Sequence, residues 1–125
     1  MNFTVTFNNI NCPVNKTFDK DIIAIRYFTL TLIINRQNNF VNITKLQEQY
    51  PGDSKKKIKD WDNKEIKQAI RKFFDKYHVE YEHSDQSENI TGTYIHPLML
   101  MPFIMWYNPD LYVSILNALV LMPKN

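Results

Sequence analysis

The pattern of apolar and polar positions divides the first half of the chain into a polar lead-in and a strand-rich stretch. Residues 1–20 are polar and rich in asparagine, apart from a short alternation at Phe3, Val5 and Phe7. Residues 22–34 are rich in β-branched and aromatic side chains, which are enriched in strands. We therefore expect an extended lead-in with an edge strand, followed by one long strand or two shorter ones.

A polar turn separates this stretch from a second, short strand. Residues 36–39 include two asparagines, which tolerate the left-handed backbone of tight turns. Residues 40–42 then return to strand composition, so residues 22–42 are predicted to form a β-hairpin. A further short strand is expected over residues 92–96, after a polar and acidic loop over residues 79–91.

Two short helices are predicted after the hairpin. Thr44 is expected to cap the first, which runs to Tyr50 and stops at the Pro-Gly pair of residues 51–52. Asp53 or Ser54 is expected to cap the second, over residues 55–61.

A longer amphipathic helix is predicted over residues 63–77. Asp62 and Glu65 have the spacing of a capping box, and the apolar positions that follow recur at i, i+3, i+4 and i+7. The face opposite this apolar stripe is mostly basic, which distinguishes it from an ordinary mixed surface.

Two apolar helices are predicted at the C-terminal end. Pro97 suits the first turn of a buried helix that is disturbed at Pro102. The sequence Asn-Pro-Asp at 108–110 supplies a cap, a first-turn proline and an early acid for a last helix that ends near Leu121. The fold class is therefore α+β: a β-hairpin or small sheet packed on about four helices.

The length and the cysteine content limit the organisation of the protein. A chain of 125 residues fits one domain, and we assign residues 1–21 to an N-terminal extension and residues 22–125 to the domain itself. Cys12 is the only cysteine, which excludes an intrachain disulfide and a cysteine-based zinc site and favours a reducing compartment. The start of the sequence lacks a signal-peptide pattern, and the longest apolar run, 97–107, is shorter than the roughly 20 residues that span a bilayer, so no membrane contact is expected.

Charge is unevenly distributed, although the net charge is only +2. Residues 55–76 contain nine basic and four acidic side chains, and an acidic stretch follows at residues 80–88. Lysine and arginine that neutralise phosphates release condensed counterions, which favours DNA binding. A run of lysines is also compatible with a simple solvated face, so charge alone leaves both interpretations open.

Other reactive side chains give little sign of catalysis or metal binding. His78 and His83 do not have the spacing of the His-Glu-x-x-His zinc motif, and His96 is expected to be a structural residue with a hydrogen-bond partner. Two glycines cannot build a glycine-rich phosphate loop. We therefore expect no enzyme activity, no cofactor and no metal.

Two separated stretches resemble the KilA-N domain of large DNA viruses and phages. The first is residues 34–46, which contain Phe-Val-Asn-Ile-Thr-Lys-Leu, followed by Lys-Lys-Ile-Lys-Asp-Trp at residues 56–61. The second is Gly-Thr-Tyr-Ile-His-Pro at residues 92–97, with Trp106 and Pro109 at the family's spacing. The resemblance covers roughly residues 25–121. The chain departs from the family pattern at Leu98, where an acid is common.

The resemblance implies a winged-helix-like, α+β DNA-binding domain related to the fungal APSES transcription factors. The chain is also similar to poxvirus members of the family that carry a RING finger, but one cysteine cannot supply a RING, so ligase activity is not expected. The expected site of action is the host cytoplasm, including viral DNA factories.

These observations predict a duplex-DNA interface that makes contact mainly with phosphates. Because the proposed face has many lysines and few side chains that read base edges, we expect weak sequence preference. The turn at residues 36–39 is expected to act as a wing. The candidate contact residues are Lys55, Lys56, Lys57, Lys59, Lys64, Lys67, Gln68, Arg71 and Lys72 in the basic segment, Arg36 and Asn38 in the turn, and Thr44 at a helix N-terminus.

The main alternative is a viral protein-interaction module that keeps the fold without binding DNA. The methionine-rich C-terminal segment motivates it, because methionine surfaces adapt to partners. Burial in the core is the favoured interpretation for these residues, with part of the surface left as the contact of a homodimer through the C-terminal helices. Both tryptophans, Trp61 and Trp106, are expected to be largely buried.

Overall fold

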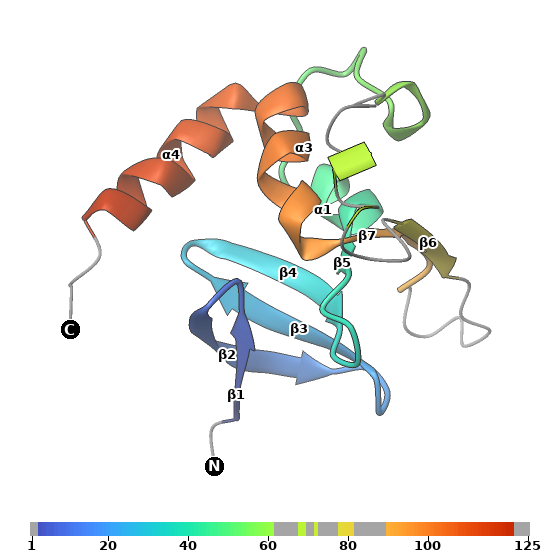
Figure 1. Ribbon diagram of the computed structural model, residues 1–125, viewed down its shortest axis with the longest axis vertical. Helices are drawn as coiled ribbons and strands as arrows, with labels where there is room; N and C mark the ends of the chain where they lie inside the picture. Colours follow the sequence, from blue (N-terminus) through green and yellow to red (C-terminus); the bar gives the residue numbers. More distant parts are fainter. Residues whose placement is uncertain (1–2, 62–67, 70–71, 73–77, 82–89, 122–125) are drawn as a thin grey trace.

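Three α-helices and an antiparallel sheet make up an α+β domain in the computed structural model, which describes residues 3–61, 68–69, 72, 78–81 and 90–121 (Figure 1). The sheet has seven strands in the order β1-β2-β3-β4-β5-β7-β6. The α+β class is confirmed. The expected count of about four helices is corrected to three among the described residues.

The N-terminal residues form a hairpin that extends the sheet. Strand β1 (Thr4–Phe7) lies at the sheet edge and pairs with β2 (Ile10–Thr17), which in turn pairs with β3. Asn8 and Asn9 both have positive φ, 48° and 67°, as a two-residue type I′ turn requires. The edge strand was expected and β2 was not. Its Cys12 is buried in the main core.

Residues 22–34 form two strands and not one. Strands β3 (Ile22–Tyr27) and β4 (Leu30–Asn35) pair over their full length, and Phe28 adopts a positive φ of 57° in the tight turn between them. Strand β5 (Val41–Asn42) pairs with β4 after a turn in which Asn39 has a φ of 63°. The predicted hairpin is therefore confirmed.

Strand β7 (Gly92–Ile95) connects the hairpin to the last strand. It pairs with β5 on one side and with β6 (His78–Tyr81) on the other. The strand predicted at residues 92–96 is confirmed, whereas the loop predicted from residue 79 is wrong for residues 79–81. The alternation that defines β6 covers only four residues, too few to stand out in a polar stretch.

Helix α1 (Ile43–Gln49) follows β5 directly and is capped by Asn42, whose Oδ1 accepts a hydrogen bond from the Lys45 amide at 2.9 Å. The assignment of the cap to Thr44 is therefore wrong by two residues. The side chain of Thr44 accepts a hydrogen bond from the Thr93 amide at 3.0 Å instead, which ties the first turn of α1 to β7. A threonine and an asparagine are both good caps, so the sequence did not separate them.

The helix predicted over residues 55–61 is also wrong. Residues 51–57 are irregular, and only a short 3₁₀ turn forms, at Ile58–Asp60. A hydrogen bond to another element holds the backbone here in place of helical hydrogen bonds: Gln47 Nε2 of α1 donates to the Lys56 carbonyl at 2.7 Å. Of the basic helix predicted over residues 63–77, Gln68 and Ala69 are helical, and the rest lies outside the described residues except for Lys72.

The C-terminal helices agree with the sequence pattern. A 3₁₀ turn at Pro97–Met99 leads into α3 (Leu100–Tyr107), and Asn108 caps α4 (Pro109–Val120) through a bond from the Leu111 amide at 3.1 Å. The disturbance expected at Pro102 is absent, because this proline lies in the first turn of α3, where its missing N–H is not needed.

The two tryptophans differ in their environments. Trp61 is 7% exposed and packs edge-on against Phe103, with 5.1 Å between the ring centres. Trp106 is only partly buried. The expectation of burial is therefore confirmed for Trp61, whereas Trp106 packs against the core with part of its ring at the surface, under the Nζ of a lysine of the irregular segment.

Replacing Asn42 with alanine is expected to lower the free energy of unfolding by about 2 kcal/mol, the upper range for loss of a helix cap. The residue is 1% exposed, and its amide also donates to the Ile90 carbonyl at 3.2 Å. Urea unfolding measures the cost. Asn42→Ser keeps a neutral capping oxygen and should cost less, whereas equal costs for the two variants would contradict the assignment of the cap.

Acid is expected to destabilise the fold through His96. Its Nδ1 accepts a hydrogen bond from the Leu98 amide at 3.1 Å, and burial lowers its pKa below the usual 6.5. Because the unfolded chain takes up the proton first, stability should be unaffected by this group above about pH 7.5 and fall as the pH drops through about 6.5, by at most about 1.4 kcal/mol per pH unit.

Urea unfolding at several pH values tests this expectation. His96→Asn keeps an acceptor at the cap and does not titrate, so its stability should depend less on pH between these limits. An unchanged pH dependence in the variant would assign the effect to other groups.

Candidate nucleic-acid interface

The first part of the candidate interface is the segment 51–57, here called the lysine strap, which crosses from α1 to the 3₁₀ turn. The Asp53 amide donates to the Tyr107 carbonyl at 3.1 Å. A Cβ added at Gly52 would lie 2.1 Å from the same oxygen, so only glycine permits this approach. The start of the strap is therefore fixed to the C-terminal end of α3.

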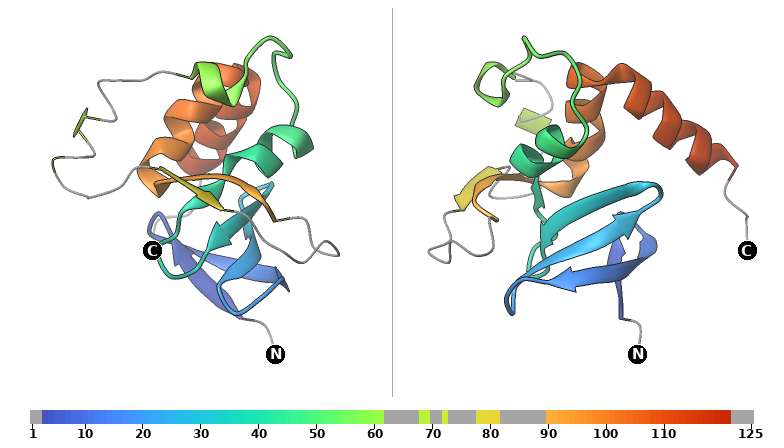
Figure 2. Two further views of the ribbon diagram at one scale, coloured as in Figure 1. Left: turned by 90° about the vertical axis from the view of Figure 1, so that its right-hand side faces the viewer. Right: turned by 180° about the vertical axis from the view of Figure 1, so that it is seen from behind.

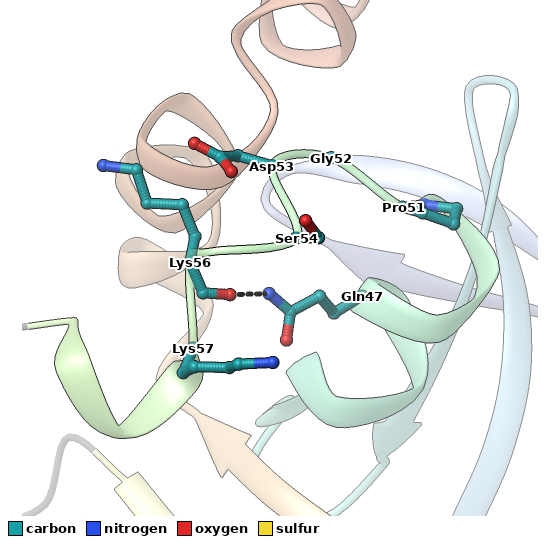
Figure 3. Close-up of a pocket in the computed structure, with 7 residues that line it drawn as sticks. All are labelled: Gln47, Pro51, Gly52, Asp53, Ser54, Lys56 and Lys57. Atoms are coloured by element: carbon teal, nitrogen blue, oxygen red, sulfur yellow. Dashed lines mark hydrogen bonds between the residues drawn. The ribbon is translucent and has the colours of Figure 1, made fainter.

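The other end of the strap is fixed to α1. Gln47 Nε2 bonds the Lys56 carbonyl (Figure 3). Within the strap, the carboxylate of Asp53 accepts a hydrogen bond from the Lys55 amide at 2.9 Å. The strap and α1 border a surface hollow of about 250 Å³. It is lined by Gln47, Pro51, Gly52, Asp53, Ser54, Lys56 and Lys57.

The three strap lysines are positioned differently. Lys55 and Lys57 are exposed, whereas the Nζ of Lys56 lies 5.0 Å from the centre of the Trp106 ring, a cation–π contact. Figure 3 shows the side chains of Lys56 and Lys57 pointing in different directions from the strap. Within the described part of the chain, no carboxylate is recorded in an ion pair with a strap lysine; Lys45 of α1 pairs with Glu48 at 3.1 Å. Two of the three ammonium groups therefore face solvent unpaired by any described residue.

The structure places only part of the predicted basic helix. Gln68 and Lys72 are exposed, as a contact with DNA requires. The side chains of Lys59, Lys64, Lys67 and Arg71 lie outside the described residues.

The turn at residues 36–39 lies far from the strap. Arg36 and Asn38 are exposed. In all three views the turn lies at the lower end of the molecule and the strap at the upper end, with α1 between them (Figures 1 and 2). The Asn38 side chain accepts a hydrogen bond from the Phe40 amide at 2.9 Å and so helps to shape the turn. The two candidate contact regions are therefore not brought together.

Thr44 belongs to a structural junction between the two stretches that carry the family resemblance. Its Oγ1 is bonded to β7, and a Cβ added at Gly92 would lie 2.7 Å from the Thr44 Cβ and 2.9 Å from Asn42 Oδ1. Gly92 also has a φ of 153°, which side chains rarely adopt. The motif residues therefore pack against one another at the β5–α1–β7 junction.

Sequence patterns did not show the residues that position the strap. Gln47, Trp106 and Tyr107 come from two helices, and their contacts join residues far apart in the chain. The one available signal was Gly52, because the sequence has only two glycines.

The geometry defines the protein as an α+β domain that presents a fixed, lysine-rich loop. A model of the KilA-N domain family matches residues 25–122, so the chain belongs to this family. A protein of Acanthamoeba polyphaga mimivirus described as containing a KilA-N domain is 28% identical over 96 residues, which cover 70% of this chain. The match spans about a quarter, 27%, of that relative's length. No solved structure matches the chain.

The described residues also bear on other kinds of site. None of the helices there has the length and apolar character needed to cross a bilayer. No three histidine, cysteine or acidic side chains gather in a cluster suited to a metal ion within the same ranges.

Replacing Gly52 with alanine is expected to displace the strap and lower the free energy of unfolding by on the order of 2 kcal/mol, as steric clashes with backbone do. The added Cβ cannot coexist with the Tyr107 carbonyl at 2.1 Å. Urea unfolding measures the cost, and Ser54→Ala, at an exposed position of the same strap, should change it by less than about 0.5 kcal/mol. Similar costs for the two variants would contradict the close approach.

Proposed function

We propose that this protein binds duplex DNA mainly through phosphates and that the lysine strap makes one of the contacts. Membership of the KilA-N family indicates a domain of viral, DNA-binding type. The observation that carries the proposal is the exposure of Lys55 and Lys57 on a loop fixed at both ends.

A fixed loop favours binding because little conformational entropy remains to be lost when DNA orders it. Lysine ammonium groups bind phosphates without strict geometry, and each contact releases counterions. Specific reading of base edges usually needs arginine, asparagine or glutamine. Among the candidate residues these are few, namely Gln68, Arg71, Arg36 and Asn38. The proposed binding is therefore weakly selective for sequence.

The proposed surface continues from the strap along the basic segment through Lys59, Lys64, Lys67, Gln68, Arg71 and Lys72. The turn that carries Arg36 and Asn38 is a second, separate contact in this proposal, in the manner of a wing. Thr44, whose hydroxyl is bonded to β7, contributes by fixing α1. A family of viral proteins that binds DNA fits an origin in a large DNA virus and action in the host cytoplasm, at viral DNA factories. The proposed role is binding and not catalysis.

A protein-interaction module is the second candidate function. Leu98 is 56% exposed, Met105 is 48% exposed and several apolar residues of α4 are exposed as well. Apolar side chains that are exposed together in a patch often mark a contact with another protein. The two functions differ in salt dependence, because counterion release makes DNA binding weaken steeply with salt, whereas an apolar contact does not.

Replacing Lys55 and Lys57 together with glutamine is expected to weaken duplex binding and to reduce the slope of log affinity against log salt by about 2, since each lost phosphate contact removes about 0.9. Fluorescence anisotropy with a random duplex at several salt concentrations measures both quantities. The fold should be unaffected, because both side chains are exposed.

The matched control is Lys16→Gln with Lys20→Gln, which removes the same charge from exposed positions in and just after β2. This pair should leave the slope close to that of the unmodified protein. Equal effects of the two double variants would mean that the strap makes no particular contact and that only net charge matters. Binding that does not respond to salt would favour the interaction module.

A further inference from the structure

Helix α4 is apolar on two faces. One face packs into the main core through Leu111, Tyr112, Ile115 and Leu119, of which Ile115 is 1% exposed. A second face is left in solvent and is also apolar. It consists of Pro109, Val113, Leu116 and Val120, here called the α4 seam, and the last three are 60%, 38% and 78% exposed.

The seam is a single stripe. Its residues are spaced i, i+4, i+7 and i+11, which places them one above another on a helix of 3.6 residues per turn. Figure 1 and the right-hand view of Figure 2 show α4 leading away from α3 at the outside of the molecule, with no described element over its outer side. A soluble helix normally has polar residues on such a face, so the seam needs a partner.

The charges of α4 favour a partner like itself. Its only charged residue is Asp110, and none of the seam residues is charged. A charged partner would therefore find no complementary charge along the stripe. A second uncharged apolar stripe needs none and matches the seam. In two antiparallel copies the Asp110 carboxylates lie toward opposite ends of the pair, about 14 Å apart along the axis, so they do not repel at close range.

The intervals between seam residues are the same whether the helix is followed from its N-terminus or from its C-terminus. Successive intervals are four, three and four residues, so a second α4 running antiparallel places Pro109 opposite Val120 and Val113 opposite Leu116, and the reverse pairs follow by symmetry. This is the arrangement that a twofold, isologous interface requires, in which residue i contacts j and j contacts i.

We propose that the α4 seam is the contact of an antiparallel homodimer. The four side chains remove on the order of 400 Å² per chain from water, within the range of functional patches on single proteins and about half of a standard interface. An interface of this size forms a weak, reversible dimer. Self-association of this kind goes beyond DNA binding and is measured without DNA.

Sedimentation equilibrium of the unmodified chain from about 1 μM to about 200 μM tests the proposal, because a weak dimer whose dissociation constant lies between these concentrations changes its average mass over the range. We expect the mass to rise from monomer to dimer. Leu116→Glu should weaken association at least tenfold, since it places a carboxylate against an apolar side chain. Asn117→Glu, an exposed position beside the seam on the same helix, should leave it unchanged.

The direction of pairing is tested with two cysteine variants, Val113→Cys and Leu116→Cys. When the two proteins are mixed and oxidised, an antiparallel pair should give the mixed disulfide in preference to either symmetric one. Circular dichroism of each variant checks that α4 is intact. A chain that stays monomeric throughout, or a dimer unaffected by Leu116→Glu, would overturn the proposal and assign the seam to a different protein or to no partner. Symmetric disulfides in place of the mixed one would overturn the antiparallel arrangement.

Discussion

The buried side-chain amide of Asn42 is the interaction on which the rest of the structure depends. Its oxygen caps α1, and its nitrogen bonds the Ile90 carbonyl just before β7, so one residue joins the hairpin, the first helix and the last part of the sheet. Gly92 approaches this amide so closely that no side chain fits there. A buried amide without these partners would cost free energy, which is why this arrangement specifies one packing of helix against sheet.

From this junction the fold positions the lysine strap in a second step. Helix α1 supplies Gln47, which bonds the strap carbonyl, and α3 supplies the Tyr107 carbonyl and the Trp106 ring. The strap has no regular secondary structure of its own, so its shape depends on these neighbours. Exposed lysines would repel one another on a loose loop, and attachment at both ends keeps them in place for a polyanion.

The elements that depend on local sequence were predicted well, and those that depend on distant contacts were not. The caps and the first-turn proline at residues 108–110 and the tight turn at Asn39 act within a few residues, so their patterns predicted α4 and the β4–β5 hairpin. The segment 55–61 has helix-forming lysines and a good cap, yet hydrogen bonds from Gln47 and to Tyr107 hold residues 51–57 open. The same limit applies to the contact between Lys56 and the Trp106 ring, which joins two elements fifty residues apart.

Asn108 links the two surfaces of this protein. Its side-chain oxygen caps α4, while its nitrogen lies 3.5 Å from the carbonyls of Tyr50 and Pro51 at the start of the strap. The same side chain therefore contributes both to the start of α4 and to the position of the strap. Because a helix is rigid over twelve residues, the orientation fixed at Asn108 extends to the end of α4. Any contact made by the outer face of α4 is consequently held in a fixed relation to the lysines of the strap. This coupling follows from the hydrogen bonds of one residue and needs no movement of the sheet.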